Sequence, residues 1–282
     1  MNRDQRALLA QETLNILANG HYQVATQTQV EIGEQIQHCV SQTQLFLPET
    51  LNALLSTLPT LDHALASKIE VVNETSLSGA SRLAKQQPER VAVLNFASAK
   101  NPGGGFLGGS QAQEESLARS SALYASQTSA AANPFYEFHR QQGTCFYSDR
   151  ALLSPACPVF RQDDGGLLQQ PYLVDFITCA APNAGAIARN EPEQLSQVAS
   201  CFQQRLELVL ALAVHANCRY LVLGAWGCGV FANDKQMVAQ AFAHSLLPGG
   251  RFAGRFEQIV FSVLDRGASA STFDTFARAL KM

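Results

Sequence analysis

The sequence NPGGGFLGGSQAQEE, at residues 101–115, constrains the fold of this chain more than any other segment. Five glycines within seven positions make a loop whose backbone can approach a ligand closely. The loop follows the apolar run 91–96, which predicts a buried strand, and it precedes residues 116–124, which have helix-forming composition. It ends on two carboxylates, Glu114 and Glu115, at the predicted start of that helix, where negative charge is favourable. A strand, a glycine loop and an acidic helix start together predict a binding site that carries an acid.

A second glycine loop, GAWGCGVFAND at residues 224–234, follows the apolar run 220–223 and precedes a predicted helix that Asn233 or Asp234 could cap. Backbone N–H groups of such a loop, together with the helix N-terminus, form a site for an anion such as a diphosphate. The glycine spacing is G-x-x-G-x-G and not the G-x-G-x-x-G of dinucleotide-binding Rossmann folds. Ligands of open α/β sheets bind beyond the carboxyl ends of the strands, so we expect the two loops to share one crevice.

Apolar runs alternate with helical patterns along most of the chain. Predicted strands at 69–72, 91–96, 172–178, 220–223 and 259–264 are separated by predicted helices at 76–86, 114–129, 191–216, 233–246 and 271–281. This alternation predicts an α/β fold with a mixed, mostly parallel sheet between helices. Residues 133–170 show little periodicity, and the sequence DDGG at 163–166 predicts the tip of a hairpin.

The organisation of the chain changes near residue 65. Residues 3–64 carry mostly helical patterning with Gln-rich polar faces, so we predict a helical N-terminal extension at 1–64 and a catalytic domain at 65–282. With 282 residues, of which 46% are hydrophobic, the chain is long enough to bury a full core. The longest strongly apolar helix candidate, 206–216, contains Glu207 and His215 and is far shorter than the roughly 20 residues of a membrane span, so no association with a membrane is predicted.

Charge and cysteine usage disfavour several other classes of function. The net charge is −3 without a Lys/Arg-rich run, so direct binding to duplex nucleic acid is not expected. Seven cysteines are dispersed singly, which is typical of reduced thiols in a cytoplasmic protein. Six histidines show no ligand spacing, so no metal site is predicted. Cys228, between two glycines, is interpreted as a small side chain in a tight turn, with a reactive thiol as the alternative.

The first loop resembles the signature of the poly(ADP-ribose) glycohydrolases, which consists of three glycines, six to eight variable residues and then Gln-Glu-Glu. Here the glycines at 103–105 are followed by seven residues and then by Gln113, Glu114 and Glu115. The second loop is similar to the diphosphate-binding loop of the same macrodomain-like fold. The resemblance covers roughly residues 65–282, and it is strongest to the compact bacterial type of the family.

This resemblance implies a macrodomain-like enzyme that cleaves the ribose–ribose bonds of poly(ADP-ribose) and releases ADP-ribose, without a metal or redox cofactor. The partners that it implies are poly(ADP-ribose) and ADP-ribosylated proteins. Two other classes stay open, namely a macrodomain reader that binds ADP-ribose without cleaving it and a hydrolase of another ADP-ribosyl linkage. The presence of both glutamates argues against the reader.

The two glutamates are expected to have different tasks. Adjacent helical residues point about 100° apart, so Glu114 and Glu115 are not expected to flank one bond from opposite sides as a conventional glycosidase pair does. By resemblance, Glu115 is the general acid/base, Glu114 holds ribose hydroxyls and Gln113 orients or supports the substrate. A helix N-terminus favours an ionised carboxylate, whereas a general acid must hold a proton, so nearby negative charge is expected to offset the helix.

The aromatic residues of the two loops have two interpretations each. Phe231 either stacks on the base of the ligand, which the resemblance favours, or belongs to the core. Phe106 either contacts the ligand or anchors the glycine loop on the domain. The residues expected to contact the ligand are Asn101, Gly103, Gly104, Gly105, Phe106, Gln113, Gly227, Cys228, Gly229, Val230 and Phe231.

Overall fold

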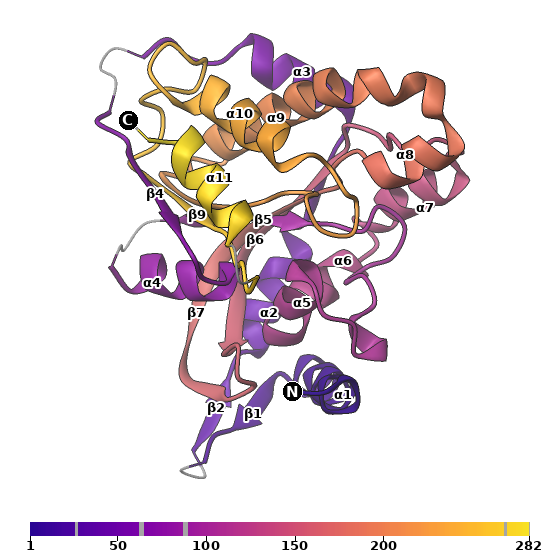
Figure 1. Cartoon of the computed structure of the whole chain (residues 1–282). Coiled ribbons are helices and arrows are strands. Elements are labelled where there is room, and N and C mark those ends of the chain that lie inside the picture. The colour runs from indigo at the N-terminus through magenta and orange to yellow at the C-terminus, as the bar shows by residue number, and fades with distance from the viewer. Residues whose placement is uncertain (26–27, 62–64, 87–89, 268–269, 282) are drawn as a thin grey trace.

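The computed structural model describes residues 1–25, 28–61, 65–86, 90–267 and 270–281. Its centre is a seven-stranded sheet with the strand order β3-β6-β7-β5-β8-β9-β4 (Figure 1). Neighbouring strands run parallel from β7 to β4, whereas the β3–β6 and β6–β7 pairs are antiparallel. The predicted mixed, mostly parallel sheet is therefore confirmed. The strands are β3 (Gln44–Phe46), β4 (Lys68–Val72), β5 (Val91–Phe96), β6 (Ala151–Arg161), β7 (Leu167–Cys179), β8 (Tyr220–Leu223) and β9 (Gln258–Ser262).

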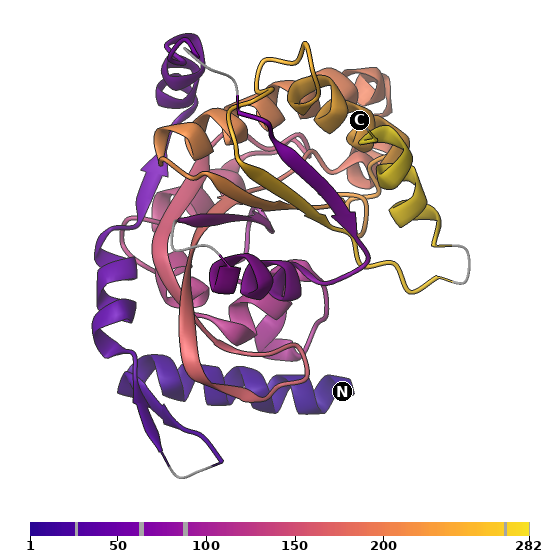
Figure 2. The ribbon, with the colours of Figure 1, turned by 90° about the vertical axis from the view of Figure 1, so that its left-hand side faces the viewer.

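Helices cover both faces of the sheet (Figures 1 and 2). In β5, Ala92 and Leu94 pack into one apolar cluster while Val91 and Val93 pack into the other, because successive side chains of a strand point to opposite faces. The first cluster includes residues of α3 (Pro48–Ser56), α9 (Val198–His215), α10 (Lys235–Leu246) and α11 (Ser271–Ala279). The second includes residues of α1 (Arg3–Asn19), α2 (Gly33–Ser41), α4 (Ser76–Gln86), α5 (Gln113–Ser120) and α6 (Leu123–Gln127).

The low-periodicity stretch 133–170 contains two elements that the sequence did not predict, α7 (Asn133–Gln141) and the long strand β6. Strand β6 carries Pro155 and Pro158, and its register with β7 shifts at a bulge between Ser154 and Cys157. At this bulge Ala156 has a φ of 47°, and its N–H donates to Asp175 Oδ1 at 2.7 Å. A bulge breaks the two-residue alternation by which a strand is recognised. The turn that joins β6 to β7 contains 163–166, so the predicted hairpin tip is confirmed.

One predicted helix, 114–129, is two helices. Between α5 and α6, Ser121 is fully extended, with φ −148° and ψ 177°, and it forms an isolated bridge with Val159 of β6. Ala122 N–H donates to Pro158 O at 3.0 Å, so a contact with a distant strand interrupts the helical hydrogen bonds. The remaining short elements are β1 (His21–Gln23), β2 (Gln29–Glu31), α8 (Ala184–Asn190), η1 (Phe106–Gly108) and η2 (Pro192–Gln197).

Within residues 1–25 and 28–61 the structure contains three helices and three short strands, and several of these elements pack against the rest of the fold. Strand β3 pairs with β6 and so extends the main sheet. Helix α1 lies beside the tip of the β6–β7 hairpin (Figure 2), where Glu12 forms a 2.9 Å ion pair with Arg161. The predicted boundary of an N-terminal extension, between 64 and 65, falls at residues 62–64, which lie outside the described residues, so this division stays a prediction.

Candidate active site

A cleft of about 750 Å³ opens at the carboxyl ends of β4, β5, β8 and β9. Its walls come from the segment after each of these strands, which brings the two glycine loops together as expected for an α/β sheet. Most of the residues expected to contact a ligand line this cleft. They are Asn101, Gly104, Gly105, Gln113, Glu114, Glu115, Gly227, Cys228, Gly229, Val230 and Phe231.

The first glycine loop folds around the Glu115 side chain. Gly105 N–H donates to Glu115 Oε1 at 3.0 Å. Gly104 has a φ of 59°, in the left-handed region, and a Cβ at this position would collide with the Glu115 carboxylate. Glycine at 104 therefore allows the backbone to approach the carboxylate closely.

Two of the expected ligand contacts, Gly103 and Phe106, do not line the cleft, which corrects that expectation. The Phe106 ring is fully buried, with its centroid 4.7 Å from that of Tyr124. Gly103 N–H donates to the buried Gln127 Oε1 at 2.9 Å. Phe106 thus follows the second interpretation, because its ring packs in the interior and anchors the glycine loop on the domain.

Glu114 is almost fully buried and accepts three hydrogen bonds. Its Oε1 accepts from Asn95 Nδ2 at 3.2 Å and Gln127 Nε2 at 3.0 Å, and its Oε2 accepts from Ser98 N–H at 2.6 Å. Burial raises the pKa of Glu114 to about 8, and the charge of Glu115 adds to the shift, although the three donors oppose it. Glu114 is thus a fixed carboxyl that holds its proton over much of the neutral range.

Glu115 has a different environment although it is the next residue. It is half-buried, and Oε1 is held by Gly105. Its Oε2 is buried and has no hydrogen-bond partner among the described residues. The two carboxylates therefore differ as expected from adjacent helical positions, with Glu114 bonded beneath the end of β5 and Glu115 bonded to the glycine loop.

Gln113 fastens the start of α5 to the end of β5. Its Oε1 accepts from Phe96 N–H at 2.9 Å, and its Nε2 donates to Leu94 O at 2.7 Å and Ser76 Oγ at 3.1 Å. Because β8 pairs with β5 only as far as Val93, the Gln113 amide takes the place of a strand partner for the last residues of β5. The polar atoms of Gln113 are thus bonded to the protein, which makes it a support for the two glutamates that follow it.

In the second loop, Gly227 is the glycine whose conformation excludes other residues. It has a φ of 75°, and a Cβ there would lie 2.8 Å from Ala181 Cβ and collide with the Asn233 amide. Gly229 has no positive φ, and a Cβ there would meet open space. Of the two candidate caps of the next helix, Asp234 is the N-cap, because its Oδ1 accepts from Met237 N–H at 2.8 Å.

Cys228 is part of the cleft wall, and burial raises the pKa of its thiol to about 12. A thiol with this pKa is protonated at neutral pH and is a poor nucleophile. The geometry therefore favours the interpretation of Cys228 as a small side chain in a tight turn.

Phe231 lines the cleft and also packs against the apolar cluster of α9 and α10. The Phe231 ring contacts the ring of Tyr147; the two ring centroids are 5.8 Å apart, and the interplanar angle is 44°. Tyr147 has a φ of 59°, a backbone conformation that is strained for a bulky residue. A strained residue must be held by its surroundings, and the loop 143–150 that carries Tyr147 is held on two sides.

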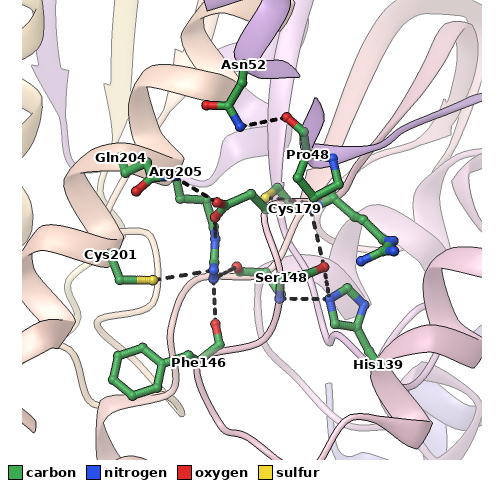
Figure 3. Close-up of polar contacts among 12 residues, drawn as sticks. Pro48, Asn52, His139, Phe146, Ser148, Cys179, Cys201, Gln204 and Arg205 are labelled. Carbon is green, nitrogen blue, oxygen red and sulfur yellow. Dashed lines mark hydrogen bonds and ion pairs between the residues drawn. The ribbon is translucent and has the colours of Figure 1, made fainter. Parts of the chain in front are cut away.

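On one side of this loop, the buried Arg205 of α9 binds it by charge-assisted hydrogen bonds (Figure 3). Arg205 Nε donates to Asp149 Oδ1 at 2.8 Å, and Nη1 donates to Phe146 O at 2.8 Å and Ala180 O at 2.9 Å. Burying an arginine is unfavourable unless its donors are paired, and here each nitrogen has a partner, since Nη2 lies 3.4 Å from Cys201 Sγ.

On the other side, the buried His139 of α7 accepts from Ser148, which Figure 3 shows between His139 and Arg205. Ser148 N–H donates to His139 Nε2 at 3.1 Å, so Nε2 carries no proton, and Nδ1–H donates to Phe135 O at 2.8 Å. Burial lowers the pKa of His139 to about 4, which keeps the ring neutral. Neither residue was predicted from the sequence, because their partners in the loop 143–150 lie 9 to 59 residues away in the chain.

The described ranges contain no group of three or more His, Cys, Asp or Glu side chains arranged to hold a metal ion. In the same part of the chain, no helix combines the length and apolar character needed to cross a membrane. All seven cysteines are free.

Comparison with known proteins identifies the family. A family model described as microbial-type PARG, catalytic domain, matches residues 10–162. A crystal structure of poly(ADP-ribose) glycohydrolase (PARG) from Thermomonospora curvata is 46% identical, with a TM-score of 0.94 over 98% of this chain and 100% of that chain. The same protein bound to the inhibitor ADP-HPD is 46% identical, with a TM-score of 0.91 over 98% and 99% of the two chains. A PARG from Deinococcus radiodurans in complex with ADP-ribose is 45% identical, with a TM-score of 0.83 over 87% and 97%. A search of curated proteins found no match.

The mixed sheet, the two glycine loops that meet in one cleft and the paired glutamates define a macrodomain-like hydrolase. More specifically, the chain belongs to the microbial-type poly(ADP-ribose) glycohydrolase family. It is a glycosidase that acts on poly(ADP-ribose).

Proposed function

We propose that Glu115 is the general acid/base that hydrolyses the ribose–ribose O-glycosidic bond and releases ADP-ribose. One observation carries this proposal. In the cleft carboxylate Glu115, a backbone N–H holds one oxygen, while the other oxygen is buried and has no hydrogen-bond partner among the described residues, so this second oxygen is left to exchange a proton. Glu114, in contrast, has both oxygens engaged by protein donors.

In the proposed reaction, protonated Glu115 gives its proton to the leaving ribose oxygen while the glycosidic C–O bond breaks. The ribosyl centre then develops oxocarbenium character, and a water molecule attacks it. The Glu115 carboxylate takes the proton from that water, which forms the new hydroxyl and restores the acid. One residue can therefore serve both steps, and no opposed second carboxylate is needed.

Glu114 is proposed to hold ribose hydroxyls in the cleft. The rigidity of Glu114 supports this proposal. Three hydrogen bonds hold its carboxyl group in place, so the group need not reorganise when a substrate binds. A helix N-terminus alone would favour two ionised carboxylates at this position. Because its pKa is raised, Glu114 is neutral or partly neutral and does not place a second full negative charge beside Glu115.

The second loop is proposed to bind the diphosphate of ADP-ribose, and Phe231 its base. The loop precedes the N-terminus of α10 and has Gly227 in a left-handed conformation, which is typical of backbone anion sites. Gly229 leaves open space in the cleft wall where a phosphate can approach the backbone.

The test of this function compares two substrates. The protein is incubated with labelled poly(ADP-ribose) and, separately, with a mono-ADP-ribosylated protein. We expect free ADP-ribose from the polymer only, released as monomers from the start because cleavage is proposed to begin at the chain end. Binding without cleavage would identify a reader, and release from the modified protein would identify a hydrolase of another linkage.

ADP-ribosylated proteins are the proposed carriers of this polymer, and the cytoplasm is the proposed compartment. Seven unpaired cysteines support a reducing compartment. A net charge of −3 argues against direct binding to duplex nucleic acid. Fractionation of cells that express the protein, followed by detection of ADP-ribosylated proteins that bind an inactive Glu115→Gln variant, tests both proposals.

A further inference from the structure

Three arginine side chains bind three successive carbonyl groups of the first glycine loop. Arg3 Nε donates to Gly108 O at 2.8 Å, Arg6 Nε donates to Gly109 O at 2.8 Å, and Arg119 Nη1 donates to Ser110 O at 2.7 Å. Two of these donors come from α1, about a hundred residues earlier in the chain, and the third comes from α5. Hydrogen bonds from charged donors are stronger than those between neutral groups, so the far side of the loop is firmly held.

Helix α1 also touches this loop through its backbone and its apolar side. Gly109 has a φ of 72°, and a Cβ there would collide with the Arg3 carbonyl, so helix and loop lie in direct contact. Ala10 of α1 shares a buried cluster with Phe106 of the loop and Ala118 of α5. Figure 1 shows α1 below α5, the helix that follows the glycine loop in the chain.

The part of the loop that α1 holds is bonded to the part that holds Glu115. Gly108 N–H and Ser110 N–H both donate to Gly105 O at 3.1 Å, and Gly105 N–H donates to Glu115 Oε1 at 3.0 Å. A displacement of the carbonyls at 108–110 would therefore move the donor that orients the carboxylate. Arg3 and Arg6 do not line the cleft, and their hydrogen bonds to the loop connect them to the site.

We infer that α1 is a positioning element of the active site, in which Arg3 and Arg6 hold the glycine loop so that Gly105 keeps Glu115 in its reactive orientation. The inference rests on the proposed role of Glu115. Arg3 and Arg6, which lie outside the signature motif, would thus contribute to turnover and not to recognition of the polymer. Misplacement of a catalytic group by about 1 Å can lower a rate by about 10², so the effect of these contacts on kcat should be large compared with their effect on affinity.

The test uses the full chain and the variants Arg6→Ala, Arg6→Lys and the double variant Arg3→Ala with Arg6→Ala. Hydrogen exchange of the backbone amides at 104–110 reports the loop directly, and kcat, KM and the Kd for ADP-ribose report function. We expect exchange in the loop to become faster and kcat to fall about 10-fold or more in Arg6→Ala and further in the double variant, with KM and Kd changed about 2-fold or less. Arg6→Lys, which keeps the charged donor, should recover part of kcat.

Two control variants distinguish a specific effect on the loop and on kcat from a general loss of stability. Leu8→Ala changes an exposed side chain of the same helix. Arg278→Ala removes an exposed arginine whose side chain donates to Asp274 O within α11. Both variants should keep the exchange rates and kcat of the parent. Unchanged loop exchange and unchanged kcat in the double variant would overturn the inference. That outcome is distinct from failure of the proposed function, which Glu115→Gln tests alone: an active Glu115→Gln variant removes the catalytic role, whereas an inactive one leaves the arginine result to decide the role of α1.

Discussion

The backbone N–H of Gly105 lies 3.0 Å from Glu115 Oε1 and donates a hydrogen bond to it. This contact joins the two ends of the signature motif, the glycines and the acid, although ten residues separate them. The neighbouring Gly104 brings its Cα so close to the same carboxylate that a side chain has no room. The spacing of the motif thus has a physical reason: a loop of this length brings its glycine backbone into contact with the carboxylate that follows it in the sequence.

Gly104→Ala should impair catalysis more than stability. A Cβ would displace the Glu115 carboxylate, and the left-handed backbone costs about 1–2 kcal/mol for a residue other than glycine. We expect poly(ADP-ribose) hydrolysis to fall by about 10-fold or more while the protein still melts cooperatively. Gly143→Ala is the matched control, since a Cβ at Gly143 meets nothing within 4 Å and should change neither property. Full activity of Gly104→Ala would show that Glu115 does not depend on the close approach of this loop.

Glu114 should make the free energy of unfolding fall as the pH rises from about 4.5 to about 8. Burial raises its pKa from 4.5 to about 8 in the folded state, so over this range the folded protein keeps a proton that the unfolded chain releases. The stabilising contribution is complete below about pH 4.5 and is lost as the pH passes through about 8. One pKa unit corresponds to about 1.4 kcal/mol.

Urea unfolding of the parent and of Glu114→Gln at a series of pH values between 4.5 and 8.5 measures this contribution. The parent should lose stability relative to the variant as the pH rises, because glutamine does not titrate. A difference between the two proteins that stays constant with pH would show that Glu114 titrates alike in the folded and unfolded states.

The two glycines around Cys228 should respond differently to substitution. Gly229→Val adds a side chain in open space on the cleft wall, so we expect an unchanged melting temperature together with weaker ADP-ribose binding. Gly227→Ala should lower both, because its Cβ meets Ala181 and Asn233 and its φ is 75°. Calorimetric titration with ADP-ribose and thermal melts of both variants check this. Binding by Gly229→Val at parental affinity would move the diphosphate site away from this loop.

Phe231→Ala should weaken ADP-ribose binding by about 1–3 kcal/mol, the contribution of one stacked base. The expected loss of stability is small, because the ring is half-buried and lines the cleft. Titration calorimetry and a thermal melt distinguish the interpretations. A variant that melts several degrees lower yet binds ADP-ribose like the parent would identify Phe231 as a core residue.

The site could be predicted from the sequence as far as it is local. The glycine loops, the glutamates and the strands before them are contiguous patterns, and α4 begins and ends at the predicted residues 76 and 86. The supports of the site are not local. Gln113 replaces a strand partner of Leu94 and Phe96, and Arg3 reaches Gly108, so both contacts depend on how distant segments meet in the fold.

The missed elements have a similar cause. Strand β6 holds two prolines and a bulge that Asp175 stabilises from β7, so its own sequence lacks the alternation of a strand. No sequence motif marks His139 and Arg205. Each binds the loop 143–150, which lies between them in the chain, so their role becomes visible only in the folded structure. The position of Phe106 next to the glycines predicts a contact with the ligand, whereas the turn directs its side chain into the interior.

The measurement that tests the catalytic proposal most directly is the hydrolysis of poly(ADP-ribose) by Glu115→Gln. Glutamine keeps the size of the side chain and the acceptor for Gly105 N–H but has no proton to transfer. Cleavage should fall by at least about 10² while calorimetry shows ADP-ribose binding close to that of the parent. A Glu115→Gln variant that binds ADP-ribose and still cleaves the polymer at the parental rate would contradict the assignment of Glu115 as the general acid/base.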